Sequence, residues 1–169
     1  GGISSAVCAR QLATLGHAVR VFDKGKGPGG RMSSRRTDSG HRFDHGAPRI
    51  DVTQPALHEL FAPAVVAGVI RRVDDAYTSP SGMNALCKWL LDGLAAQYAT
   101  KIIRLERTDS WNAFDEKSQS HGPFDAVVLA VPPVNAAEAV IGQNAELART
   151  IASVRMLPRW VAMLAFSEP

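Results

Sequence analysis

The hydrophobic and polar positions near the start of the chain follow two different periods, and each period predicts a type of element. Residues 3–15 carry apolar side chains at helical spacing, and Gly16 follows them as a C-terminal stop. Residues 18–23 form a short β-branched and aromatic run that ends at Asp23, which predicts a strand. Residues 24–36 are rich in glycine and basic side chains, so we expect a loop there.

Beyond this loop, shorter patterns alternate between helix and strand. Helices are predicted over residues 53–63, where Pro63 ends the first, over residues 135–141 and over residues 145–152. A stronger helix, capped by Ser79 or Ser81, has an apolar face formed by Met83, Leu86, Cys87, Leu90 and Leu94. Strands are predicted over residues 101–107, 110–114, 124–131 and 160–166, with a polar loop over residues 115–122. The run over residues 124–131 is almost wholly apolar, which is typical of a parallel strand buried on both faces.

The composition fits one globular domain with a small appendage. Of the 169 residues, 46% are hydrophobic and 21% charged, and no apolar run approaches the roughly 20 residues of a transmembrane helix. The N-terminal residues do not have the pattern of a secretory signal. Two cysteines, Cys8 and Cys87, are too few for a disulfide framework and suit a reducing compartment. We therefore expect a cytoplasmic protein that binds no membrane, and its net charge of +3 favours anionic partners.

The first residues match part of the phosphate-binding turn of a dinucleotide site. Gly2 stands directly before the predicted helix, where the second glycine of G-x-G-x-x-G would lie, and Ser5 occupies the position of the third. Asp23 follows Gly2 by 21 positions, where a carboxylate can accept both ribose hydroxyls of an adenosine. Because the chain starts at Gly1 without a methionine, we expect the first glycine and the first strand to lie upstream. An ordinary glycine turn is the alternative, which the spacing disfavours.

A second glycine-rich segment follows Asp23 at once. Residues 24–36 read K-G-K-G-P-G-G-R-M-S-S-R-R, in which glycines let backbone amides approach a phosphate and Arg31 offers a bidentate guanidinium. An NAD dehydrogenase does not need a second loop of this kind at the end of its second strand. A flavin enzyme that binds the longer FAD does.

Several segments, taken in order, resemble the bacterial renalase-like branch of the FAD-dependent amine oxidase superfamily. The first runs over residues 21–47 and includes D-K-G-K-G-P-G-G-R-M-S-S-R-R and F-D-H-G-A. The others are S-G-M-N-A-L at residues 81–86, F-D-A-V-V-L-A-V-P-P at residues 124–133 and L-P-R-W-V-A-M-L-A-F at residues 157–166. The resemblance implies an α/β chain: a Rossmann-like FAD-binding domain without its first strand, together with part of an α+β substrate domain. The FAD-binding domain would comprise residues 1–50 and 81–152, and the partial substrate domain residues 51–80 and 153–169.

The resemblance also implies which residues contact FAD. Gly2, Ile3 and Ser5 would lie over the pyrophosphate, and Asp23 would hold the adenosine ribose with Lys24 beside it. Gly30 and Arg31 would lie at the flavin side of the pyrophosphate, with Met32 and Ser33 nearby. Gly46 and Ala47 would lie near the isoalloxazine ring, and the backbone of Ile103 would contact the adenine. Ala130 and Pro132 would lie at the end of a strand against the cofactor.

The implied activity is that of an FAD-dependent oxidoreductase. A small substrate, either a misreduced NAD(P)H isomer or an amine, would pass a hydride to the flavin, and oxygen would then reoxidise it. Neither substrate needs a protein nucleophile, so we name no catalytic acid or base, and this stretch of chain can be inactive by itself. Two alternatives stay open: an NAD(P)-binding dehydrogenase or regulatory module without flavin, and a non-catalytic remnant.

Two other interpretations of polar clusters are weaker. His41 and His45 flank Asp44, but no third histidine or cysteine stands at a recognisable spacing, so we predict no metal site. The basic residues of the 24–36 segment have no interleaved aromatic side chains on which bases could stack, so we expect no nucleic-acid partner.

Overall fold

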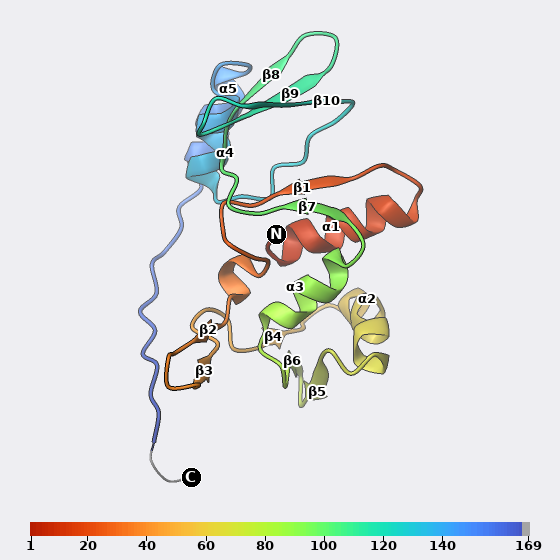
Figure 1. Cartoon of the computed structure of the whole chain (residues 1–169), viewed down its shortest axis with the longest axis vertical. Coiled ribbons are helices and arrows are strands. Elements are labelled where there is room, and N and C mark those ends of the chain that lie inside the picture. The colour runs from red at the N-terminus through yellow and green to blue at the C-terminus, as the bar shows by residue number, and fades with distance from the viewer. Residues whose placement is uncertain (167–169) are drawn as a thin grey trace. The chain divides into compact units, whose positions relative to one another are not determined.

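The computed structural model describes residues 1–166, which form two compact units (Figure 1). Unit 1 comprises Gly1–Arg20, Gly27–Ala95 and the segment from Trp160 onward, and unit 2 comprises Val21–Lys26 and Ala96–Arg159. The helices of unit 1 are α1 (Ile3–Thr14), the 3-10 helix η1 (Gly30–Met32), α2 (Pro55–Val66) and α3 (Asn84–Leu91). Its strands are β2 (Arg35–Arg36), β3 (Arg42–Phe43), β4 (Ile50–Asp51), β5 (Arg71–Val73) and β6 (Ala76–Thr78).

The end of α1 confirms the predicted stop at Gly16. The amide of Gly16 donates to the Ala13 carbonyl (3.0 Å), and the amide of His17 reaches back to the Leu12 carbonyl (3.1 Å). These are the two hydrogen bonds of a Schellman motif, which satisfies carbonyls that the helix end would leave without partners. Leu15, predicted on the apolar stripe, is 73% exposed because it caps the helix instead of continuing its buried face.

Helix α1 lies alongside α3 (Figure 1). Ala6 and Ala9 are the buried positions of α1, and side chains of this size let two helices approach closely. From the same helix, the Arg10 guanidinium donates through Nε to the Leu90 carbonyl (2.8 Å) and through Nη2 to the Asp92 carbonyl. A cation at this place satisfies the last carbonyls of α3 and complements the negative end of its dipole.

Helix α2 packs on a small sheet of order β4-β6-β5. The ring of Phe61 meets Tyr77 of β6 edge to face at 5.6 Å, and His58 Nδ1 lies 2.7 Å from the Tyr77 hydroxyl. The prediction that Pro63 ends this helix is wrong, because α2 continues to Val66. Pro63 cannot donate to the carbonyl of Glu59, but Glu59 lies on the exposed side of the helix, where water can hydrate that carbonyl.

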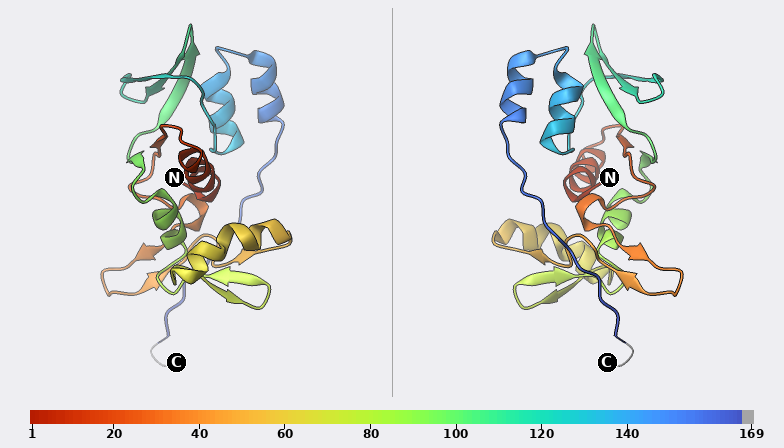
Figure 2. Two further views of the ribbon diagram at one scale, coloured as in Figure 1. Left: turned by 90° about the vertical axis from the view of Figure 1, so that its right-hand side faces the viewer. Right: turned by 90° about the vertical axis from the view of Figure 1, so that its left-hand side faces the viewer.

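Unit 2 is built on an antiparallel sheet of order β10-β9-β8, made of β8 (Ile102–Arg107), β9 (Trp111–Asp115) and β10 (Ser120–Phe124). Two helices, α4 (Pro133–Val140) and α5 (Ala145–Ala152), pack side by side, and α4 also contacts β8 (Figure 2). Their shared core consists of Leu105, Ala113, Ala137, Ala139, Val140 and Ala148. The short strands β1 (Arg20–Phe22) and β7 (Ala95–Gln97) pair with each other.

Three strand and loop predictions for the second half are wrong. The predicted loop over residues 115–122 is shorter, because Ser120–Phe124 forms a third strand against β9. Residues 125–131 contain no strand, and Val128 is 62% exposed. An apolar run becomes a strand only when a neighbour supplies hydrogen-bonding partners, and no strand within residues 1–166 pairs with this one.

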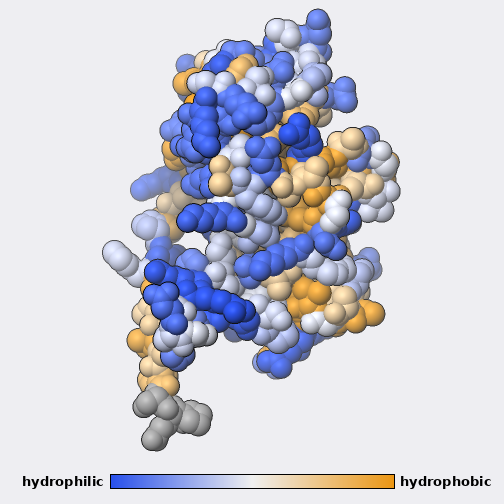
Figure 3. All heavy atoms as spheres, viewed as in Figure 1, coloured by the Kyte–Doolittle hydropathy of each residue, from blue (hydrophilic) through white to orange (hydrophobic). Residues whose placement is uncertain are grey.

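The predicted strand over residues 160–166 is likewise absent. These residues have no regular structure, and Trp160 is fully exposed. Figure 3 shows the stretch as a hydrophobic strip close to the C-terminal end. Among the helices of residues 1–166, none is long and apolar enough to cross a membrane.

Candidate functional site

The N-terminus of α1 has no side-chain cap. Its N-cap is Gly2, which has extended backbone (φ −77°, ψ 176°) and no side chain to cover the helix end. The first helical hydrogen bond runs from the Ala6 amide to the Gly2 carbonyl (2.9 Å), so the amides of residues 3–5 have no partner within the helix. The first turn contains no acidic side chain to compete with an anion.

The second glycine-rich segment lies directly against this helix end. Gly29 forms a parallel bridge with Gly2, and the Gly29 amide donates to the Gly1 carbonyl (2.8 Å). A β-carbon on Gly30 would stand 3.0 Å from the Gly2 Cα, and Gly30 has a left-handed backbone (φ +52°). A β-carbon on Gly2 would meet Gly30 only at an ordinary 3.7 Å, so the close approach requires glycine mainly at position 30.

The F-D-H-G-A segment crosses the same loop. The Ala47 amide donates to the Arg31 carbonyl (2.9 Å), and a β-carbon on Gly46 would lie 2.0 Å from that carbonyl oxygen. No side chain fits between these backbones. The predicted site residues Gly30, Arg31, Gly46 and Ala47 are therefore neighbours, although the chain separates the two pairs by 14 residues.

Asp44 connects three segments that are separate in the sequence. Its Oδ1 accepts hydrogen bonds from the Ser34 hydroxyl and from the Met83 amide (3.0 Å), and the Ser34 hydroxyl also lies 3.2 Å from Asn84 Oδ1. Met83 is the N-cap residue of α3. The prediction that Ser79 or Ser81 caps this helix is thus wrong, because the side chain of Asp44 satisfies the amide instead. The G-G-R-M-S-S-R-R, F-D-H-G-A and S-G-M-N-A-L segments converge here.

The two side chains of η1 divide between core and surface. Met32 is buried, with 4% of its surface exposed, and anchors the loop. Arg31 is exposed, and its guanidinium has no hydrogen bond or ion pair with another residue in the described part of the chain. Ser33 turns its hydroxyl onto the Gly30 carbonyl (2.5 Å), and the Ser5 hydroxyl on α1 accepts from the Gly1 nitrogen (3.3 Å). The guanidinium donors of Arg31 are therefore not used by any other described residue.

Unit 2 contains the predicted ribose-binding carboxylate. Asp23 follows β1 directly; its amide donates to the Gln97 carbonyl (2.9 Å), and its carbonyl accepts from the Thr100 amide (2.9 Å). Its Oδ1 accepts from the Gly25 amide (2.7 Å), which closes an Asx turn. These bonds fix the carboxylate at the end of the strand. The neighbouring Lys24 is exposed.

The other predicted contacts of unit 2 have different surroundings. Ile103 lies on β8 at a bulge, since the register moves from Ile102–Asp115 to Arg104–Phe114 and leaves Ile103 opposite no residue of β9. Ile103 is 41% exposed. Ala130 and Pro132 do not end a strand as predicted: both are exposed, and Pro132 is the N-cap residue of α4.

Unit 2 also holds a buried, hydrogen-bonded Asp–His pair that the sequence patterns did not predict. His121 Nε2 lies 3.0 Å from Asp115 Oδ2, and the two side chains are 4% and 6% exposed. The hydrogen bond from His121, helped by the backbone amides of Gln119 and Lys117, holds the pKa of Asp115 below its ordinary value of 3.8. The polar residues around position 115 read as loop, so the sequence contained no sign of a buried pair.

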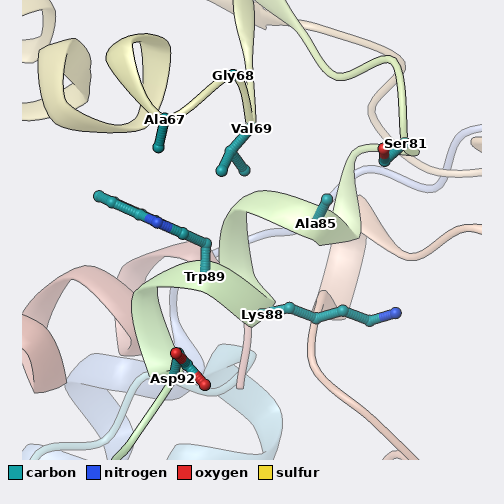
Figure 4. Close-up of a pocket in the computed structure, with 8 residues that line it drawn as sticks. All are labelled: Ala67, Gly68, Val69, Ser81, Ala85, Lys88, Trp89 and Asp92. Atoms are coloured by element: carbon teal, nitrogen blue, oxygen red, sulfur yellow. The ribbon is translucent and has the colours of Figure 1, made fainter.

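A pocket of about 410 Å³ lies elsewhere in unit 1. In Figure 4 the indole of Trp89 extends below the side chains of Ala67 and Val69, while the side chain of Lys88 points away. The complete lining is Ala67, Gly68, Val69, Ser81, Ala85, Lys88, Trp89 and Asp92. None of the predicted site residues lines this pocket, so it is separate from the candidate site around Gly2, Gly30 and Gly46.

Residues 1–63 match the family model of an NAD(P)-binding Rossmann-like domain. The matched stretch contains the turn at Gly2, helix α1, strand β1 and Asp23. It also contains the whole second glycine-rich segment, residues 24–36. It confirms the predicted Rossmann-like α/β fold class and identifies the N-terminal part of the chain as a dinucleotide-binding fold.

Proposed function

We propose that the dinucleotide held by this chain is FAD and that the protein is a flavin-dependent oxidoreductase of the renalase-like type. The observation that supports this most is the contact between the two glycine turns, at Gly2 and at Gly29–Gly30, beside the unpaired guanidinium of Arg31. One glycine turn at a helix N-terminus suffices for a pyrophosphate. A second turn with its own cation suits a ligand that continues past the pyrophosphate to a flavin.

The residues of unit 1 fit this group. A β-carbon on Gly46 would lie 2.0 Å from the Arg31 carbonyl oxygen, and one on Gly30 would stand 3.0 Å from the Gly2 Cα, so larger residues at these positions would crowd the backbone beside the helix end. The amides of residues 3–5 and the Arg31 guanidinium would bind the pyrophosphate, and Ile3 and Ser5 would flank it. Met32 would hold the loop in place, and Gly46 and Ala47 would pass beside the flavin ring.

In unit 2, Asp23 would accept hydrogen bonds from the adenosine ribose with Lys24 nearby. The backbone of Ile103 would meet the adenine, and Ala130 and Pro132 would approach the cofactor from the segment before α4. FAD, when bound, supplies the redox chemistry by taking a hydride from the substrate and returning electrons to oxygen. Residues 1–50 and 81–152 would form the FAD-binding domain, and residues 51–80 and 153–169 part of the substrate domain. The partners would be a small cytoplasmic substrate, either a misreduced NAD(P)H isomer or an amine, and oxygen.

A second candidate is an NAD(P)-binding module without flavin, which the description of the matched family model favours. A ligand series separates the two. The melting temperature of the chain is measured with FAD, FMN, NAD, NADP and ADP-ribose at equal concentrations, because a ligand that binds only the native state raises it. We expect FAD to raise it most. An equal or larger rise with NAD or NADP would replace our proposal by the second candidate.

A further inference from the structure

We propose that the buried Asp115–His121 pair positions Asp23 for the adenosine ribose, an inference that rests on the ribose-binding role proposed for Asp23. All residues concerned lie in unit 2. In this proposal His121 is a positioning residue and does not contact the ligand. It acts through Phe22, the last residue of β1, which immediately precedes Asp23.

Asp115 holds the imidazole ring of His121 in place. Asp115 Oδ2 binds His121 Nε2 at 3.0 Å, while Oδ1 accepts the amides of Lys117 and Gln119, both at 2.9 Å. Both carboxylate oxygens are therefore committed, one to the turn between β9 and β10 and the other to the ring. A carboxylate accepts only, so the geometry assigns a proton to His121 Nε2. This bond restricts the rotation of the ring.

The second step is the contact of that ring with β1. The centroids of His121 and Phe22 are 4.9 Å apart with the planes tilted by 51°, and Phe124 meets Phe22 edge-on at 6.2 Å. Two residues of β10 thus hold the ring of Phe22. An apolar side chain at position 121 would bury comparable area, but it would lack the directional bond that fixes one orientation.

Phe22 affects the proposed ribose contact because it is the chain neighbour of Asp23. The backbone of Asp23 is held by its hydrogen bonds to Gln97 and Thr100, and its Oδ1 accepts from the Gly25 amide. Because the ring of Phe22 also packs on His121, residues 22 and 23 have little freedom to rotate. A carboxylate that must meet two adjacent hydroxyls gains affinity from such preorganisation.

A double-mutant cycle tests this inference. The probe is ADP-ribose, which carries the adenosine ribose but no flavin, and its dissociation constant is measured for His121→Gln, Asp23→Ala and the combined variant. Glutamine can still donate to Asp115 but has no ring to pack on Phe22. We expect the His121→Gln variant to bind ADP-ribose about tenfold more weakly than the wild type. We expect the combined variant to bind it no more weakly than Asp23→Ala alone. An equal loss in both backgrounds would overturn the inference.

Two further variants separate positioning from stability. Phe22→Leu removes the other ring of the Phe22–His121 contact and should weaken ADP-ribose binding to the same extent as His121→Gln. The Phe22→Leu/His121→Gln double variant should bind ADP-ribose no more weakly than either single variant. Val140→Ala, a buried change in α4, should lower the melting temperature and leave ADP-ribose affinity unchanged. If Val140→Ala weakens ADP-ribose as much as His121→Gln does, the effect is general destabilisation and the inference is wrong.

The wild-type chain distinguishes this inference from the proposed function. If it binds ADP-ribose but not FAD, the flavin proposal fails while the cycle still decides the role of His121. If it binds neither ligand, both proposals are contradicted.

Discussion

Gly2 and Gly30 meet backbone to backbone: a β-carbon on Gly30 would stand 3.0 Å from the Gly2 Cα. One glycine opens helix α1 and the other belongs to a loop that follows it by about 28 residues in sequence. The contact brings the N-terminal end of α1, where the amides of residues 3–5 have no partner within the helix, against the glycine-rich loop of unit 1. The proposed cofactor site depends on this contact.

Replacing Gly30 with alanine should disturb the contact itself. The new methyl group would press on the Gly2 backbone, and the left-handed conformation of residue 30 (φ +52°) costs a non-glycine residue about 1–2 kcal/mol. We expect a lower melting temperature and a loss of FAD binding. Gly27→Ala is the matched control in the same loop, because a β-carbon there would meet nothing within 4 Å. Wild-type FAD affinity in Gly30→Ala would show that the contact does not shape the site.

Removing the Asp44 side chain should loosen the junction of three segments. Asp44→Ala leaves the Met83 amide at the start of α3 without its cap and takes the carboxylate from the Ser34 hydroxyl. Loss of a helix cap costs about 0.5–2 kcal/mol, so urea unfolding should shift by that amount. Asp44→Asn should recover part of it because the amide oxygen can still accept. Asp38→Ala, an exposed change in the same unit, should have no effect, and similar losses from both alanine variants would argue against a cap.

The Asp115–His121 pair predicts how stability depends on acid. Because the folded state lowers the pKa of Asp115, this carboxylate stabilises the fold above its ordinary value of 3.8. That contribution is lost as the pH falls below 3.8 through the lower folded value. The free energy of unfolding, measured by urea at a series of pH values, should therefore fall more steeply below pH 3.8 in the wild type than in Asp115→Asn. An exposed carboxylate provides the control, and Asp125→Asn should keep the wild-type slope. Identical acid profiles in all three proteins would contradict the assignment.

Local patterns predicted what local interactions determine. Helix α1 and its stop at Gly16 follow from residues within one turn of each other, and the bonds from Gly16 and His17 confirm that interpretation. The same holds for α5, where the Asn144 side chain accepts from the Leu147 amide. The Rossmann-like fold of the first part of the chain was predictable for the same reason, because its spacing is carried by one helix and one strand.

Long-range partners explain what the sequence analysis missed. Asp44 caps helix α3 through the Met83 amide, which lies 39 residues later, and nothing in the local pattern of F-D-H-G-A indicates this. Residues 124–131 have the composition of a buried strand, but a strand also needs neighbours, which composition does not supply. The same reason applies to residues 160–166.

The FAD affinity of the wild-type chain and of its Arg31→Ala variant shows whether this guanidinium binds the cofactor. Arg31 is exposed and makes no ion pair within the described residues, so its loss should leave the fold intact. A charged hydrogen bond to phosphate contributes about 1.5–3 kcal/mol, which corresponds to a weakening of about 10- to 100-fold. The exposed Arg35 of β2 is the matched control. We predict that the wild type and Arg35→Ala bind FAD alike and that Arg31→Ala binds it at least about tenfold more weakly. A wild-type chain that binds no FAD, or equal affinities in all three proteins, would contradict the account.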